Sequence, residues 1–242
     1  MNVSVVIPVR NDALLLRRAL DALAAQTRPL AELVIVDNGS TDDSAEVAAA
    51  AGARVVTEPI AGIPRAASAG YDAATGDIIL RIDADTIVPP TWLEHAAQAF
   101  ESDPSLDLLT GDAEFYDAGA VTRALGKAIW IGGMYWASQR WLGHPMVFGS
   151  NFGMRRRIWL QLSGEVHRYR LGIHDDVDLS LHLKPWMTVR RDRAWVAGIS
   201  ARPFDTVGDI ARRVRWVGGS IRGHGSPWRR KALRDRWREE GT

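Results

Sequence analysis

Short apolar segments rich in β-branched residues alternate with amphipathic segments along the first 112 residues. "VSVVIPV" (3–9) lacks polar alternation, which is typical of a strand buried on both faces. "DALLLRRALDALAAQ" (12–26) then repeats leucine and alanine at helical spacing. Further strands are predicted at 32–37, 54–58, 77–83 and 106–112, and further helices at 40–52, 64–76 and 90–100. This order predicts an α/β fold with a mostly parallel, Rossmann-like sheet flanked by helices.

The second half of the chain is less regular. "GSNFGMRRRIWLQL" (149–162) predicts a short strand that leads into a helix, and a polar loop follows at 163–173. Another helix is predicted to open at "HDDVDLSLHL" (174–183). No break in composition separates the halves, so we expect a single domain over 1–242 with halves of about 1–115 and 116–242.

Composition excludes several classes of site and segment. The 242 residues include no cysteine, which excludes disulfides, thiolate zinc sites and cysteine nucleophiles. The N-terminus lacks a basic region and a cleavage site, so it is interpreted as a strand. The apolar segment at 124–137 is too short to cross a bilayer, which takes about 20 residues. We therefore expect a cytoplasmic protein.

Charge is divided unevenly along the chain. Residues 1–120 contain 7 Lys and Arg against 19 Asp and Glu, whereas residues 121–242 contain 23 against 10. Such a division is compatible with a face for an anionic partner and equally with an uneven solvated surface. The basic tail "SPWRRKALRDRWREE" (226–240) is either an amphipathic helix at the inner face of a membrane or a solvated terminal helix.

Two aspartates follow the predicted fourth strand in "GDIILRIDADTIVPP" (76–90). In open α/β sheets ligands bind at the carboxyl ends of the strands, so we expect Asp83 and Asp85 to share one rim with Asp37, which ends the second strand. The carboxylates repel each other unless a divalent cation lies between them and a phosphate, as Mg²⁺ does in proteins. Ordinary turn formation is the alternative for an isolated Asp-x-Asp.

An ordered set of motifs resembles the family 2 glycosyltransferases, inverting enzymes of the GT-A fold. The motifs are "VSVVIPVRND" at the start, "VIVDNGSTDDS" (34–44), "GIPRAASAGYDAATGDIILRIDADT" (62–86), "GSNFGMRR" (149–156) and "HDDVDLSLHL" (174–183), and the resemblance covers roughly 3–220. It implies a nucleotide-sugar-binding half, a looser acceptor-binding half, and Mn²⁺ or Mg²⁺ as cofactor. Uridine is the commonest base in such relatives, so a UDP-sugar is the expected donor, with guanosine and thymidine still open.

The resemblance assigns roles to residues of the first half. Asp85 would contact the metal directly, while Asp83 would face the ribose or a metal-bound water, and Asp37 would accept a hydrogen bond from the base. The remaining residues implied at the nucleotide are Pro8, Val9, Asn11, Asn38 and Arg65. Arg65 is included because relatives often have Arg-Asn where this chain has Ala67-Ser68.

The same resemblance makes Asp176 the catalytic base and Asp175 the residue that helps to place the acceptor. Displacement at an anomeric carbon needs a base for the acceptor's proton and a group that stabilises the departing diphosphate. One carboxylate opposite the leaving group serves the first need, and attack from that side inverts the centre. Helix capping is the alternative for both aspartates.

The second half departs from the family pattern. No histidine follows the predicted strand at 194–200, and we interpret His224 as a solvent-exposed residue rather than a lid ligand of the metal. "RRVRW" (212–216) resembles the Gln-x-x-Arg-Trp element of processive members, so Arg215 is a candidate for the diphosphate and Trp216 for the acceptor. Without the membrane helices of those polymerases, transfer of one sugar to a glycan or lipid-linked acceptor is favoured.

Other functions fit the residues less well. A sugar-phosphate nucleotidyltransferase would need a glycine-rich loop after the first strand, and "VIPVRND" has no glycine. A dinucleotide-dependent oxidoreductase would need a Gly-x-Gly-x-x-Gly turn, which is also absent. A non-catalytic nucleotide-sugar-binding protein would keep Asp37, Asp83 and Asp85 but has no use for Asp176. No nucleic-acid partner is expected.

Overall fold

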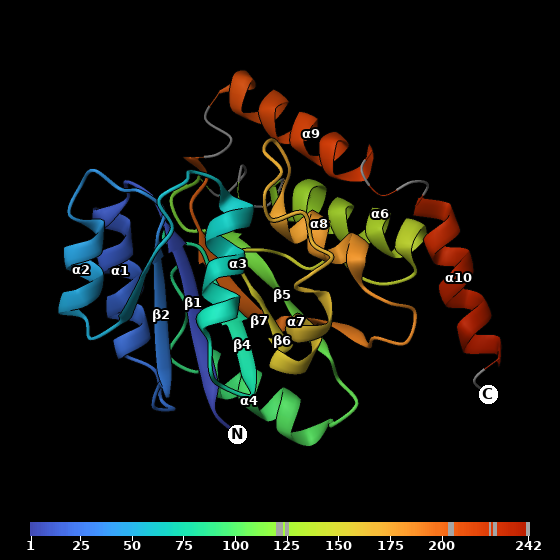
Figure 1. Ribbon diagram of the computed structural model, residues 1–242, viewed down its shortest axis with the longest axis horizontal. Helices are drawn as coiled ribbons and strands as arrows, with labels where there is room; N and C mark the ends of the chain where they lie inside the picture. The colour runs from blue at the N-terminus through green and yellow to red at the C-terminus, as the bar shows by residue number, and fades with distance from the viewer. Residues whose placement is uncertain (120–122, 124–125, 203–205, 223, 225–226, 241–242) are drawn as a thin grey trace.

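A seven-stranded sheet runs through the computed structural model, which describes residues 1–119, 123, 126–202, 206–222, 224 and 227–240 (Figure 1). The strand order is β3-β2-β1-β4-β6-β5-β7. The strands are β1 (Val3–Val9), β2 (Glu32–Asp37), β3 (Arg54–Thr57), β4 (Ile78–Arg81), β5 (Leu108–Phe115), β6 (Phe152–Arg155) and β7 (Val189–Ile199). Strands β1 to β4 pair in parallel, as do β5 and β7, while β6 is antiparallel to β4 and β5. The predicted mostly parallel α/β fold is confirmed.

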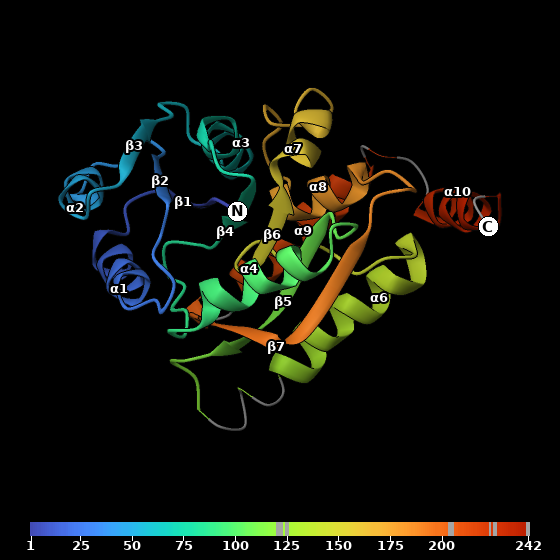
Figure 2. The same ribbon diagram turned by 90° about the horizontal axis from the view of Figure 1, so that it is seen from below.

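Helices cover both faces of this sheet (Figure 2). One face packs on α1 (Ala13–Ala24), α2 (Ser44–Ala50) and α4 (Trp92–Ser102), and the other on α3 (Ile63–Ala73), α7 (Arg156–Leu162) and α8 (Asp175–His182). Successive residues of β1 supply opposite cores: Val5 and Ile7 belong to the first, Val6 to the second. Because side chains alternate across a strand, a run that is apolar throughout buries both faces.

The second half adds helical segments at 126–142 and 207–222 that the sequence pattern does not predict, and a C-terminal helix that it does. Residues 126–142 form a π-helical segment, η1 (Gly126–Gly132), continued by α6 (Gly133–Leu142). Helix α9 (Val207–Arg222) lies over α8, and α10 (Pro227–Glu240) packs against α6 (Figure 1). Within the described residues, none of the helices combines the length and apolar character that crossing a bilayer requires.

The two halves named in the sequence analysis share one sheet. Strand β6, from the second half, inserts between β4 and β5 of the first. Its antiparallel direction was not predicted, because pairing across 40 or more residues leaves no local signal in a four-residue strand. The single-domain organisation over 1–242 stays a prediction.

Candidate functional site

A pocket of about 390 Å³ opens at the carboxyl ends of β1 and β4. It also receives the N-terminus of α8, the turn before β6 and one side of α9. Its polar and charged lining is Arg10, Asp12, Arg81, Asp83, Asp85, Ser150, His174, Asp175, Asp176, Ser200, Arg212 and Arg213, and its other lining residues include Pro8, Val9, Phe148 and Trp216. The structure thus brings the predicted Asp83, Asp85, Asp175 and Asp176 together.

A buried arginine organises the carboxylates at the floor of the pocket. Arg81 ends β4 with a side chain only 3% exposed, and its guanidinium lies 2.8 Å from Asp83 and 3.6 Å from Asp175. Burial lowers the pKa of Arg81, but the charges of Asp175 and Asp83 outweigh that effect and raise it. The sequence analysis missed Arg81, although a charge inside the apolar run "IILRID" was a usable signal, because a buried charge requires partners.

Asp85 lies at the rim of the pocket beside a second arginine. Arg202 Nη2 is 3.3 Å from Asp85 Oδ2 and 2.7 Å from Asp12 Oδ2. Burial, followed by the charge of Asp83, raises the pKa of Asp85 to about 6, although Arg202 opposes that shift. Asp83 in turn accepts a 2.6 Å hydrogen bond from Ser150 Oγ. In this structure Arg202 supplies positive charge beside Asp85.

This donor set suits a divalent cation that prefers oxygen. Asp83 and Asp85 present carboxylate oxygens to a pocket wide enough for phosphate and water, which are the other usual ligands of Mg²⁺. Burial and then the charge of Asp83 raise the pKa of Asp85, and both effects disfavour a bare carboxylate that a bound ion would stabilise. Because Arg202 contacts the same carboxylate and is half exposed, it competes with an ion for this place.

Asp176 occupies the first turn of α8. Its Oδ2 accepts a 2.9 Å hydrogen bond from Gly149 N–H, and its Oδ1 accepts a 2.7 Å bond from Val177 N–H. A Cβ at Gly149 would lie 1.9 Å from Arg81 Nη1, so only glycine allows this close approach. The carboxylate thus serves its own helix terminus, as the capping alternative required, and also lines the pocket.

Asp175, beside Asp176 at the start of α8, faces the buried Arg81. Burial raises the pKa of Asp175 to about 6, and the charge of Asp176 adds to the shift, whereas Arg81 opposes it. The side chain is 12% exposed and faces the Arg81 guanidinium. This contact ties the start of α8 to the end of β4.

Helix α9 contributes a basic wall. Arg212, Arg213 and Trp216 line the pocket, and the Trp216 ring meets the His174 ring edge-on at 5.5 Å between centroids. Arg215, the predicted diphosphate residue, is exposed and is not among the lining residues. The positive charges of α9 that line the pocket are therefore those of Arg212 and Arg213, and the role of Arg215 at a diphosphate stays a prediction.

The predicted nucleotide residues divide into two groups. Pro8 and Val9 line the pocket, whereas Asn11, Asp37, Asn38 and Arg65 do not. The side chains of these four residues contact residues that do not line the pocket. Asn11 has a φ of +52° and accepts a 2.7 Å hydrogen bond from Thr41 N–H, and Asp37 accepts one from Ser40 N–H. The Asn38 side chain is hydrogen-bonded to the main chain of Glu58, Ile60 and Gly62. The Arg65 guanidinium lies over the Tyr169 ring. Their roles at a nucleotide stay predictions.

The expectation that His224 is solvent-exposed is wrong. Its side chain is 2% exposed and lies 3.2 Å from the Asp178 carboxylate. Nor does His224 line the pocket, so the alternative of a lid ligand at Asp85 gains no support. The burial of the His224 side chain is not revealed by the glycine-flanked histidine in "RGHGSPW".

Comparison with known proteins decides the family. The sequence profile described as glycosyl transferase family 2 matches residues 4–162, more than half of the chain. This chain belongs to that family. It is 36% identical over 115 residues to an undecaprenyl-phosphate 4-deoxy-4-formamido-L-arabinose transferase of Pectobacterium carotovorum, covering 41% of this chain and 35% of the relative. An uncharacterised glycosyltransferase of Nostoc is 33% identical over 129 residues, covering 48% and 40%. The chain thus spans less than half the length of these relatives.

Solved structures confirm the predicted GT-A fold. A mannosyltransferase from Pyrobaculum calidifontis, in complex with GDP-mannose and Mn²⁺, superposes with a TM-score of 0.71 at 21% identity, covering 97% of this chain and 68% of that one. Glucosyl-3-phosphoglycerate synthase from Mycobacterium tuberculosis, with Mn²⁺, UDP and its product, gives 0.65 at 20% identity, covering 92% and 79%.

Proposed function

We propose that this family 2 member is a metal-dependent, inverting glycosyltransferase that moves one sugar from a nucleotide-diphosphate sugar to an acceptor hydroxyl. The observation that carries the proposal is one pocket that joins the carboxylates of Asp83 and Asp85 to the carboxylate of Asp176. The structural neighbours crystallised with GDP-mannose or UDP and Mn²⁺ support the donor class and the ion.

The metal would be held by Asp85, with Asp83 beside it. When bound, Mn²⁺ or Mg²⁺ supplies positive charge that stabilises the departing diphosphate. Arg212 and Arg213 line the same pocket and add fixed positive charge toward that group. Arg202 must release Asp85 for the ion to bind, and its 50% exposed side chain has solvent to move into.

Asp176 would act as the base. Each carboxylate oxygen already accepts one main-chain hydrogen bond and keeps a further lone pair for the acceptor hydroxyl. In the transfer, the acceptor O–H bond breaks and its proton passes to Asp176 while the oxygen bonds to the anomeric carbon. The bond from that carbon to the phosphate oxygen breaks, and its electron pair leaves with the diphosphate. One displacement from the face opposite the leaving group inverts the centre.

Replacing the base tests this proposal directly. Asp176→Asn keeps the size of the side chain and one acceptor oxygen, which can hold one of the two main-chain bonds, but removes the base. Transfer should be nearly abolished while donor binding persists, measured by product formation and by titration with the nucleoside diphosphate and Mn²⁺. Unchanged transfer would favour the alternative of a non-catalytic nucleotide-sugar-binding protein.

A UDP-sugar is the proposed donor, and its base is testable by melting. Specific ligands raise the melting temperature by mass action. The shifts measured with UDP-, GDP- and dTDP-sugars in the presence of Mn²⁺ should therefore differ clearly, with the UDP-sugar giving the largest. The GDP-mannose complex of one neighbour makes guanosine the main competitor. A larger shift with GDP-sugars would overturn the choice of uridine and leave the reaction class intact.

A lipid-linked acceptor is the finer proposal for the second substrate. An apolar groove of about 250 Å³ runs between α6 and α9 and shares Trp130 with the pocket. Its other lining residues include Met134, Trp141, Leu142, Val177, Leu181, Val214, Val217 and Ile221. A groove without charged lining that continues the pocket suits a hydrocarbon chain, and the relative named for undecaprenyl phosphate agrees.

A matched pair of variants tests the groove. Val214 lines it and is 59% exposed, whereas Ile210, one turn earlier on α9, is exposed but does not line it. Val214→Asp should reduce transfer to a polyprenyl-linked acceptor and spare donor binding, and Ile210→Asp should leave both unchanged. Equal loss in both variants would contradict a lipid in the groove, and efficient transfer to a soluble glycan alone would favour the glycan acceptor.

Contact with the membrane is proposed through the basic C-terminal helix. Helix α10 exposes Leu233 and Trp237 among its arginines, and such helices associate with anionic headgroups. Sedimentation with anionic liposomes should recover the protein, with binding lost as salt rises. Equal recovery with neutral liposomes would show that the charge is not involved.

A further inference from the structure

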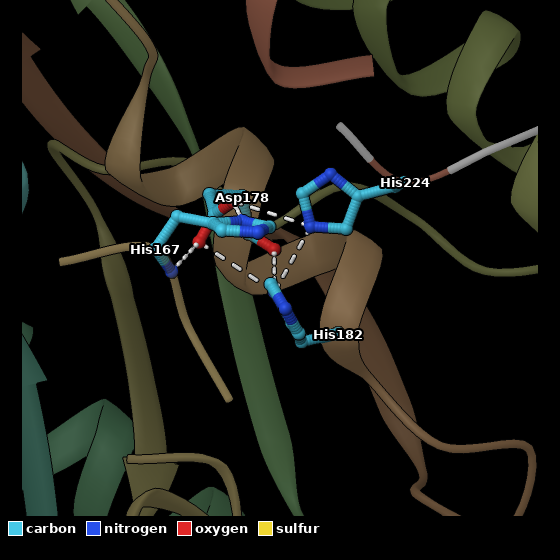
Figure 3. Close-up of side chains that lie close together, drawn as sticks. All are labelled: His167, Asp178, His182 and His224. Carbon is cyan, nitrogen blue, oxygen red and sulfur yellow. Dashed lines mark hydrogen bonds and ion pairs between the residues drawn. The ribbon is translucent and has the colours of Figure 1, made fainter. Parts of the chain in front are cut away.

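Three histidines and one aspartate converge outside the pocket. His167 comes from the loop after α7, Asp178 and His182 from α8, and His224 from the segment after α9 (Figure 3). One candidate ligand atom from each residue lies within 4.8 Å of the others. We call these four residues the histidine cluster. It is mostly enclosed, with side-chain exposures of 4%, 9% and 2% for Asp178, His182 and His224, and 36% for His167.

The separations within the cluster are close to those of ligands around one ion. His224 Nε2 lies 3.2 Å from His182 Nδ1 and 3.2 Å from Asp178 Oδ1, and His182 Nδ1 lies 3.5 Å from Asp178 Oδ2. A tetrahedral zinc ion with bonds of 2.0 to 2.1 Å places neighbouring ligand atoms about 3.3 Å apart. His167 Nδ1, at 2.8 Å from Asp178 Oδ1, completes the set.

Hydrogen bonding fixes which nitrogen of His224 faces the cluster. Its Nδ1 lies 2.6 Å from the main-chain oxygen of Ser220, which only accepts, so Nδ1 carries a proton. The Nε2 lone pair of a neutral ring then points at Asp178 Oδ1 and His182 Nδ1. Histidine ligands of metals typically donate their second N–H to a carbonyl in this way.

The buried Asp178 carboxylate needs positive charge or hydrogen-bond donors beside it. His182 Nδ1 lies 2.8 Å from the main-chain oxygen of Asp178, which only accepts, so Nδ1 carries a proton that a bound ion would replace. The charge can come from extra protons on the rings or from a bound cation, and these two possibilities differ in a measurable way.

We propose that the histidine cluster binds one zinc ion, at a site separate from the pocket. Three imidazoles and one carboxylate are a donor set for zinc, whereas Mg²⁺ and Ca²⁺ select oxygen. Four protein ligands leave no open position, so the ion is structural rather than catalytic. The partly exposed His167 provides the side from which the ion enters.

The zinc would fasten the second half of the chain around the pocket. Helix α8 begins with Asp175 and Asp176, and α9, which ends two residues before His224, carries Arg213 and Trp216 of the pocket lining. An ion held by His224 and by Asp178 would fix α9 against α8. This consequence rests on the proposed function, but the site itself does not.

Metal content of tag-free protein tests the site. After chelator treatment and incubation with zinc, the wild type should retain one ion per chain through dialysis. His224→Gln and His182→Gln should each lower zinc affinity more than the about 100-fold that loss of an outer-shell partner costs. His95→Gln is the matched control, because His95 also bonds an aspartate, Asp192 at 2.8 Å, outside the cluster.

Two further measurements keep the test independent of folding and of catalysis. Cobalt bound to the wild type should show the strong visible absorption of a four-coordinate ion, which needs no variant. Asp85→Asn should keep full zinc binding, so loss of the proposed activity and loss of zinc are separable. Three results would each overturn the proposal: a wild type that binds no zinc, zinc retained by His224→Gln, or zinc lost in Asp85→Asn. If the wild type binds no zinc, protons on the histidine rings supply the positive charge instead.

Discussion

The pocket and the histidine cluster both need positive charge, yet they are built in opposite ways. The pocket is open, its donors are carboxylate oxygens, and a half-exposed arginine contacts Asp85. The cluster is enclosed, and most of its donors are ring nitrogens held by main-chain contacts. Helix α8 carries residues of both, with Asp176 at its start and Asp178 and His182 further on. The difference suits an exchangeable ion in the pocket, as the proposed function requires, and a structural ion in the cluster, as the zinc proposal requires.

The largest expected effect belongs to Asp176 and concerns the pocket alone. Asp176→Asn should lower the turnover number by about 10²- to 10⁴-fold, the usual contribution of a general base. Asp21→Asn, in the exposed part of α1, is the control and should match the wild type. Zinc content should stay unchanged in both variants. A turnover within twofold of the wild type would remove the carboxylate from the reaction.

Asp85 should matter for binding more than for the fold. Asp85→Asn removes the charge that holds the ion, so Mn²⁺-dependent affinity for the nucleoside diphosphate should fall by about 10- to 100-fold, equivalent to one to two pKa units of charge interaction. Calorimetric titration with and without Mn²⁺ measures this loss. Affinity that is equal in the variant and the wild type would place the ion elsewhere.

Acid should weaken the pocket's cation site with a defined midpoint. Burial and the charge of Asp83 raise the pKa of Asp85 to about 6, so its carboxylate is protonated below that pH and cannot bind an ion. The affinity for Mn²⁺ should be constant above pH 7 and should fall about tenfold for each pH unit below pH 6. Electron paramagnetic resonance of free Mn²⁺ gives the profile. A flat profile from pH 5 to 8 would mean that Asp85 is not a ligand.

The smallest effect is expected at Arg202. Arg202→Ala removes a competing cation, so affinity for Mn²⁺ alone should rise, by at most about fivefold because the pair is half exposed and screened by solvent. Arg202→Lys keeps the charge and should stay near the wild type. A fall in Mn²⁺ affinity on Arg202→Ala would show that the arginine supports the ion instead of competing with it.

The sequence predicted the first half well because its signals are local. Strand β1 and helix α1 are predicted from apolar runs, and the place of Asp83 and Asp85 is predicted from their position just after β4. Arg81 was readable in principle, since a charge in an apolar strand needs buried partners. The main-chain contacts of Asn38 were not readable, because only the folded chain shows its amide bonded to the carbonyl oxygens of Glu58 and Ile60.

The second half depends on contacts between distant residues. Asp178 and His182 stand at i and i+4, which puts them on one face of a helix and was a usable signal. His224 lies 42 residues beyond His182, and nothing in its neighbourhood indicates that the chain folds back. The place of β6 in the sheet and the approach of Arg212 and Arg213 to the pocket have the same origin.

The central claim is that Asp83 and Asp85 seat a divalent ion bridged to the diphosphate of a nucleotide-sugar donor. Crystals grown with UDP or GDP and Mn²⁺, measured on both sides of the manganese absorption edge, test it most directly. The account predicts one anomalous peak between the Asp85 carboxylate and the diphosphate, inside the pocket. Nucleotide and manganese found together at another place, with the pocket occupied by solvent alone, would contradict it.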